Sequence, residues 1–154
     1  MPTPREAPAV AVGPFILVPG GYSRGNKHDA VEMFVPAEQG WKKLPKLGQA
    51  ISAHSAAVLG RWLFLFGDYN DSTTVLSYEL PTRKTARLKP GFTGTQFSTA
   101  LAHGDRLYVV GGQAQDSGRA GGLSARNAAQ SGGSERDLVQ VFALRPDGGA
   151  ANTR

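Results

Sequence analysis

The chain has 154 residues, of which 40% are hydrophobic and 19% are charged, so it is long enough to bury the core of one domain. It has no cysteine, which excludes a disulfide scaffold, a thiolate zinc site and a cysteine nucleophile. Its formal net charge is +5, but the basic residues are scattered and do not alternate with aromatic residues, so nucleic acid is a disfavoured partner.

The N-terminal sequence MPTPREAPAVAVG lacks the long apolar run of a secretory signal. No apolar stretch of the chain approaches the roughly 18 residues that a membrane-spanning helix needs. With the absence of cysteine, this predicts an intracellular, cytoplasmic protein that does not bind membranes.

Three apolar runs that end in glycine recur along the chain: FILVPGG at 15–21, WLFLFGD at 62–68 and RLYVVGG at 106–112. A stretch of small apolar residues precedes each run, and a glycine separates the two. These separating glycines are Gly13, Gly60 and Gly104. Because glycine tolerates a positive φ, the pattern predicts a tight turn between two strands in each of three repeated units.

Two further strands are expected in the first two units. VEMFVP (31–36) and VLSYELP (75–81) both end in proline, which cannot donate to a ladder, and LVQVFALRP (138–146) is a third copy. WKKLPKL (41–47) and KTARLKP (84–90) are typical of polar outer strands. The third unit is expected to lack this outer strand, because the chain continues only into AANTR.

These patterns predict an all-β chain of four-stranded antiparallel units, since no segment has a sustained period of 3.6 residues. The second strand of each unit is apolar on both faces, which predicts that it lies between neighbouring sheets. Residues 113–137 are rich in glycine, serine, alanine and glutamine, and we expect them to form a mobile loop.

The repeat resembles the Kelch-repeat β-propeller family over about residues 7–146. The marks of resemblance are the doublets Gly20-Gly21 and Gly111-Gly112, an aromatic residue in each third strand (Phe34, Tyr78 and Phe142), Trp41 before Leu44-Pro45, and His54. The chain departs from the family at Gly67-Asp68, at Thr85, which aligns with Trp41, and at Ser98, which aligns with His54.

The resemblance implies about three propeller blades in an incomplete ring. The expected divisions are an N-terminal tail (1–6), a first blade (7–47), a second blade (48–90), a third blade (91–146) with the insertion 113–137, and a C-terminal tail (147–154). A closed propeller has about four to eight blades. A second copy could complete a six-bladed ring, another chain could supply blades, or the chain could be part of a longer propeller.

The resemblance further implies a non-enzymatic interaction or scaffold module that binds protein partners through blade loops on one face. By position these loops are 22–30, 68–74 and 113–137, together with 48–53 and 91–96. The predicted contact residues, which favour an acidic partner, are Tyr22, Arg24, Asn26, Lys27, His28, Tyr69, Asn70, Arg119, Arg126 and Arg136.

No catalytic residue, metal site or cofactor is expected. The histidines His28, His54 and His103 have no ligand spacing, and GGYSRGNKH (20–28) lacks the phosphate-binding pattern. We expect His54 to be a half-buried strand residue bonded to a neighbouring loop, and His103 to be exposed. Two alternatives remain open: a completed ring that binds or processes a small molecule or carbohydrate, similar to a sugar mutarotase, and a structural subunit of a larger complex.

Overall fold

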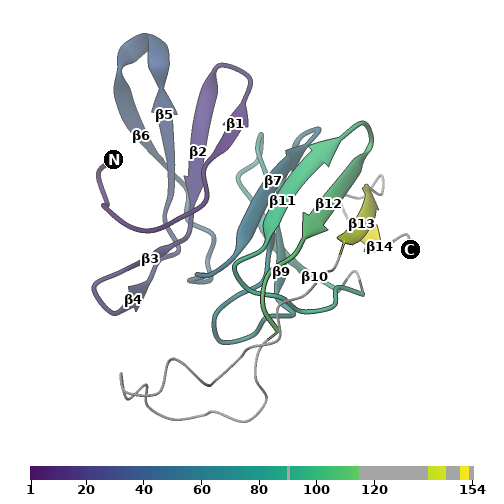
Figure 1. Ribbon diagram of the computed structural model, residues 1–154. Helices are drawn as coiled ribbons and strands as arrows, with labels where there is room; N and C mark the ends of the chain where they lie inside the picture. Colours follow the sequence, from purple (N-terminus) through teal and green to yellow (C-terminus); the bar gives the residue numbers. More distant parts are fainter. Residues whose placement is uncertain (90, 115–138, 145–149, 153–154) are drawn as a thin grey trace.

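The computed structural model describes residues 1–89, 91–114, 139–144 and 150–152 (Figure 1). These residues form three four-stranded antiparallel sheets and one two-stranded hairpin, so the prediction of an all-β chain is confirmed. The sheets stand side by side, and β7 of the second sheet contacts β1 of the first and β11 of the third. In the part of the chain described, the sheets do not close on themselves.

The first sheet has the order β1 (Val10–Val12), β2 (Phe15–Pro19), β5 (Val31–Val35) and β6 (Gly40–Leu44). The second comprises β7 (Ser55–Leu59), β8 (Trp62–Phe66), β9 (Val75–Glu79) and β10 (Thr85–Leu88). The third comprises β11 (Thr99–His103), β12 (Arg106–Val110), β13 (Val139–Leu144) and β14 (Ala150–Asn152). A hairpin of β3 (Tyr22–Ser23) and β4 (Asn26–Lys27) follows β2, and the 3-10 turn η1 (Pro36–Glu38) links β5 to β6.

The predicted turn glycines occupy equivalent positions in the three sheets. Gly13, Gly60 and Gly104 have φ angles of 54°, 59° and 60°, and each joins the first strand of its sheet to the second. Residues three positions later pair with the third-strand aromatic residues: Ile16 with Phe34, Leu63 with Tyr78, and Leu107 with Phe142. The three units therefore share one register, as the repeat predicted.

Two expectations from the sequence were wrong. The third sheet does not lack an outer strand, because β14 pairs with β13 through residues expected to form a C-terminal tail. The segment 22–30 is not a simple loop, since it contains the β3–β4 hairpin. The mobile loop predicted at 113–137 lies almost entirely outside the described residues.

The second sheet is buried on both sides, and β8 supplies both interfaces. Leu63 and Leu65 pack in one cluster with Leu17 and Val31 of the first sheet. Phe64 and Phe66 pack in a second cluster, where Phe66 lies 5.2 Å from Phe142 of the third sheet, centroid to centroid. The prediction that a second strand is sandwiched is thus confirmed for β8, because successive side chains on a strand point to opposite faces. It is wrong for β2 and β12, which belong to the end sheets and leave Ile16 and Val110 exposed in the described part of the chain.

The second and third sheets meet at a backbone junction that admits only glycine. Gly67 has a φ of +86°, and a Cβ built on it would lie 2.2 Å from the carbonyl oxygen of Thr95. Both conditions exclude a side chain, since L-residues rarely adopt this φ and a carbonyl oxygen in the backbone cannot move aside cheaply.

The two end sheets are covered to different extents. On the third sheet, Leu101, Val110 and Val139 are 44%, 40% and 58% exposed and lie on the face turned away from the second sheet. On the first sheet, Arg5 of the N-terminal segment reaches Glu32 of β5, and both side chains are buried. Within the described residues, no helix is long and apolar enough to cross a membrane.

Candidate ligand-binding pocket

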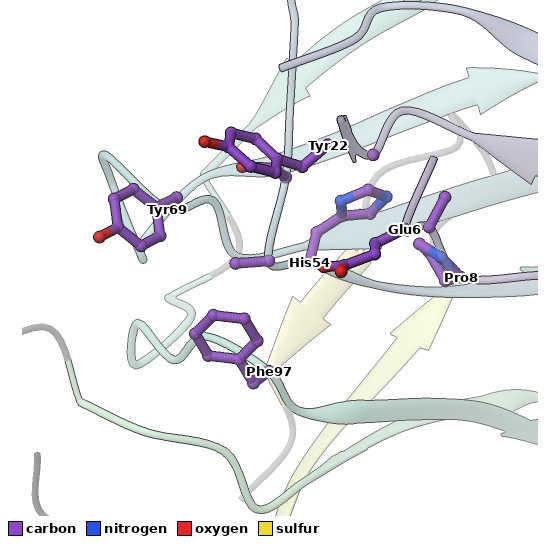
Figure 2. A pocket seen from close by; sticks show the side chains of 10 residues that line it. Glu6, Pro8, Tyr22, His54, Tyr69 and Phe97 are labelled. Carbon is purple, nitrogen blue, oxygen red and sulfur yellow. The ribbon is translucent and has the colours of Figure 1, made fainter. Parts of the chain in front are cut away.

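A cavity of about 470 Å³ opens where the first strands of the three sheets begin (Figure 2). Its lining comes from the N-terminal segment, from the residues after β2 and β8, and from the residues before β7 and β11. The lining residues are Glu6, Ala7, Pro8, Gly21, Tyr22, Ser52, Ala53, His54, Tyr69 and Phe97.

The pocket is built from repeat-equivalent positions. Glu6, Ala53 and Phe97 each stand seven residues before the turn glycine of their sheet, and Tyr22 and Tyr69 each stand nine residues after it. Backbone hydrogen bonds join these segments: the Tyr22 amide donates to the Glu6 carbonyl over 2.8 Å, and the Phe97 amide donates to the Ala53 carbonyl over 2.9 Å. The repeat thus brings one segment from each sheet to the same opening.

Three aromatic side chains surround the opening. Tyr22, Tyr69 and Phe97 are 43%, 49% and 60% exposed, and Figure 2 shows their rings around the space beside His54. Phe97 has a φ of 54°, a left-handed conformation that is costly for a bulky residue. An exposed aromatic residue held in this way is the kind of strain that clusters at binding sites.

His54 forms part of the pocket wall. It precedes β7 by one residue, is 6% exposed, and its Nε2 lies 3.2 Å from the carbonyl oxygen of Pro19, to which it donates. Nδ1 has no hydrogen-bond partner among the described residues. Burial lowers the pKa of His54 from 6.5 to about 4, against the opposing effects of the Pro19 hydrogen bond and the Asp68 charge. His54 is therefore neutral near pH 7, and it is more buried than the sequence suggested.

Glu6 carries the only charge among the described lining residues at neutral pH. Its side chain is exposed, and within the described part of the chain its carboxylate has no ion-pair or hydrogen-bond partner. In Figure 2 the carboxylate extends between His54 and Phe97.

An ion pair beside the pocket holds the β3–β4 hairpin against the second sheet. Lys27 Nζ donates to Asp68 Oδ2 over 2.7 Å, and the Asp68 side chain is 4% exposed. The other oxygen of Asp68 accepts the Ser52 amide over 2.9 Å. Asp68, which stands where the other units have a second glycine, thus fixes the two segments that carry Tyr22 and Ser52.

The residues that the sequence predicted to form one contact face lie in different environments in the structure. Tyr22 and Tyr69 line the pocket, whereas Lys27 is engaged by Asp68 and His28 Nε2 lies 2.8 Å from Ser23 Oγ. Arg24 and Asn26 are exposed at the tip of the β3–β4 hairpin, and Asn70 is exposed beside Tyr69. Arg119, Arg126 and Arg136 lie outside the described residues. His103 is exposed at the end of β11, as predicted.

Sequence reasoning missed Glu6, Ala53 and Phe97 as pocket residues and assigned His54 a structural role. Their position within the repeat could have identified these three residues, because each stands seven residues before the turn glycine of its sheet. The pocket offers aromatic faces and one carboxylate, which are groups for recognition.

No protein-family model matches the chain, and the search of curated proteins also finds no match.

Proposed function

We propose that the chain is a non-enzymatic binding module of Kelch-type propeller blades that holds a protein partner at its loop face. The observation that carries this proposal is the cavity rimmed by Tyr22, Tyr69 and Phe97. The blade assignment is supported by three four-stranded antiparallel sheets that share one register.

The dimensions and composition of the pocket suit a segment of a partner protein. A volume of about 470 Å³ accommodates one or two side chains and falls within the range of ligand sites, roughly 300–1,000 Å³. Tyrosine is enriched among residues that dominate binding energy, and it loses little conformational entropy when it is fixed. Backbone hydrogen bonds hold the two tyrosines in place: the Tyr22 amide donates to the Glu6 carbonyl, and the Tyr69 amide donates to the Ser52 carbonyl over 3.0 Å.

A further sheet would complete the module on one side. The exposed Leu101, Val110 and Val139 occupy the face of the third sheet that corresponds to the face by which the second sheet packs on the third. We therefore propose that a second copy or another chain adds blades there. Light scattering behind size exclusion tests the first option: a mass twice that of the chain supports it, and a monomer contradicts it.

A carbohydrate is the second candidate ligand of the pocket. Aromatic rings around an opening also bind the apolar faces of sugars, and the exposed Glu6 carboxylate could accept a hydrogen bond from a sugar hydroxyl group. If the ligand is a carbohydrate, glycans should compete with peptides for the same pocket.

Selection from a phage library of random 12-residue peptides tests the proposal. We expect the wild-type chain to enrich peptide families, and a Tyr22→Ala, Tyr69→Ala double variant to lose them. Ile16→Ala is the matched control, because it removes an exposed apolar side chain of β2 that does not line the pocket. Equal enrichment by the double variant, or none by the wild type, contradicts the proposal. Binding on a glycan array that depends on Tyr69 would favour the carbohydrate instead.

A further inference from the structure

The geometry points to a cationic group, the side chain of a lysine or arginine of the partner, as the ligand that the pocket accepts. This inference rests on the proposed function and specifies the chemistry of the same site.

The first support is the convergence of aromatic faces. Tyr22, Tyr69 and Phe97 come from three separate segments and lie around one opening (Figure 2). A cation within about 6 Å of an aromatic ring centroid is attracted by the electron-rich face, and the attraction increases when the cation is desolvated. A recess bordered by several rings can provide this contact from more than one side.

The second support is the free carboxylate of Glu6. It lies at the opening that the three rings surround (Figure 2), and it has no ion-pair or hydrogen-bond partner among the described residues. A carboxylate placed in this way can form a charge-assisted hydrogen bond with an ammonium or guanidinium group, and such bonds are stronger than neutral ones.

The third support is that two cations close to the lining residues in the sequence or the fold, Lys27 and Arg5, are already paired with carboxylates. Lys27 is paired with Asp68, and Arg5 is paired with Glu32 with its side chain 0% exposed. His54 carries no charge near pH 7, because burial keeps its pKa at about 4. No described cation lining the pocket therefore competes for Glu6 or repels the ligand.

The net charge of the chain, +5, opposes the binding of a cationic group in the pocket only weakly. Exposed charges separated by more than a Debye length, about 8 Å at physiological ionic strength, are largely screened. The sign of the lining charge therefore outweighs scattered surface charges for a group that enters the pocket. A partner that is acidic overall and inserts one basic residue into the pocket is compatible with the positive net charge of the chain and with the negative lining charge.

Titration with three small probes, followed by the NMR chemical shifts of the pocket residues, tests the inference. The probes are N-acetyl-lysine amide, N-acetyl-arginine amide and the uncharged N-acetyl-norleucine amide. We expect a cationic probe to bind roughly tenfold more tightly than norleucine. Glu6→Gln should weaken the cationic probes several-fold and leave norleucine unchanged. Glu38→Gln is the control, because Glu38 is an exposed carboxylate paired with Lys42 away from the pocket. Equal binding of all three probes, or no effect of Glu6→Gln, overturns the inference.

The peptide selection separates this inference from the proposed function. Peptides that depend on Tyr22 and Tyr69 and are enriched in lysine or arginine support both. Peptides that depend on these tyrosines without such enrichment keep the proposed function and overturn the cationic ligand. Tight binding of the cationic probes without any selected peptide supports the site chemistry and contradicts a protein partner.

Discussion

Arg5 donates to Glu32 over 2.7 Å, and both side chains are almost completely shielded from solvent. The guanidinium also donates to the carbonyl oxygens of Thr3 and Val18, and the Thr3 hydroxyl donates to the other Glu32 oxygen over 2.8 Å. Burial opposes ionisation of Glu32, but the hydrogen bonds from Arg5 and Thr3 hold its pKa below the usual value. The N-terminal segment is thus fastened across the first sheet.

Arg5→Met should lower the free energy of unfolding by about 3 kcal/mol, because it leaves the Glu32 charge buried without its ion-pair partner. The Arg5→Met, Glu32→Leu double variant should recover most of this loss. Leucine suits that position, since Leu76 takes the corresponding place in the second sheet. Urea unfolding at pH 7 measures both variants. A double variant as unstable as Arg5→Met would show that the pair itself, rather than the unpaired charge, decides stability.

The same pair contributes to acid sensitivity. A carboxyl group whose pKa is lowered by folding stabilises the folded state above its unfolded pKa, here about 4.5, and that contribution is lost as pH falls. The Arg5→Met, Glu32→Leu variant should therefore lose less stability than the wild type below pH 4.5.

His54 should make the chain less stable as pH falls from 6.5 to about 4. The unfolded chain binds a proton at the ordinary pKa of 6.5, whereas the folded chain does so only at about 4, so protonation in this window favours unfolding. The contribution amounts to on the order of 3 kcal/mol. Urea titrations should give a flatter pH dependence in this window for His54→Gln. The exposed His103→Gln should behave as the wild type, and an unchanged slope in His54→Gln would refute the assignment.

Gly67→Ala should destabilise the chain more than Gly13→Ala. Both glycines have positive φ angles, so alanine is strained at each, but only at Gly67 would the new Cβ collide with a backbone carbonyl oxygen. Around Gly13 nothing lies within 4 Å of a Cβ. The difference should be at least about 1 kcal/mol in thermal or urea unfolding, and equal losses would argue against close packing at this junction.

Phe97→Asn should stabilise the chain and abolish ligand binding. Asparagine tolerates the left-handed conformation that Phe97 adopts, so the replacement should raise the free energy of unfolding by about 1 kcal/mol. It also removes one of the three pocket rings. Thermal unfolding and the probe titrations measure the two effects. A variant that is less stable than the wild type would show that Phe97 is held by packing instead of being strained.

Much of the fold followed from the spacing of a few glycines. Gly13, Gly60 and Gly104 set the turn in each sheet, and the apolar runs after them identified the second strands. The alignment of Trp41 with Thr85 also agrees with the structure, because both pair with the third-strand aromatic residue. Periodicity predicts such elements well, since buried strands must repeat their apolar pattern.

The remaining features depend on contacts that no local pattern reveals. β14 has the sequence AAN, which has no apolar alternation, and β3 and β4 have two residues each. Burial of Arg5 depends on Glu32, 27 residues away. Phe97 stands just before a strand and reads as an ordinary apolar residue, because its left-handed backbone and its exposure arise only when the sheets assemble.

The two faces of β8 pack against different neighbouring sheets, and this restricts changes in the length of the strand. Leucines at 63 and 65 face one neighbour and phenylalanines at 64 and 66 face the other. Deletion or insertion of one residue in β8 would exchange the two faces, so that both interfaces would be mismatched at once. Length changes are tolerated far better in surface connections. We therefore expect natural variation in length to accumulate between the strands, with β8 keeping five residues.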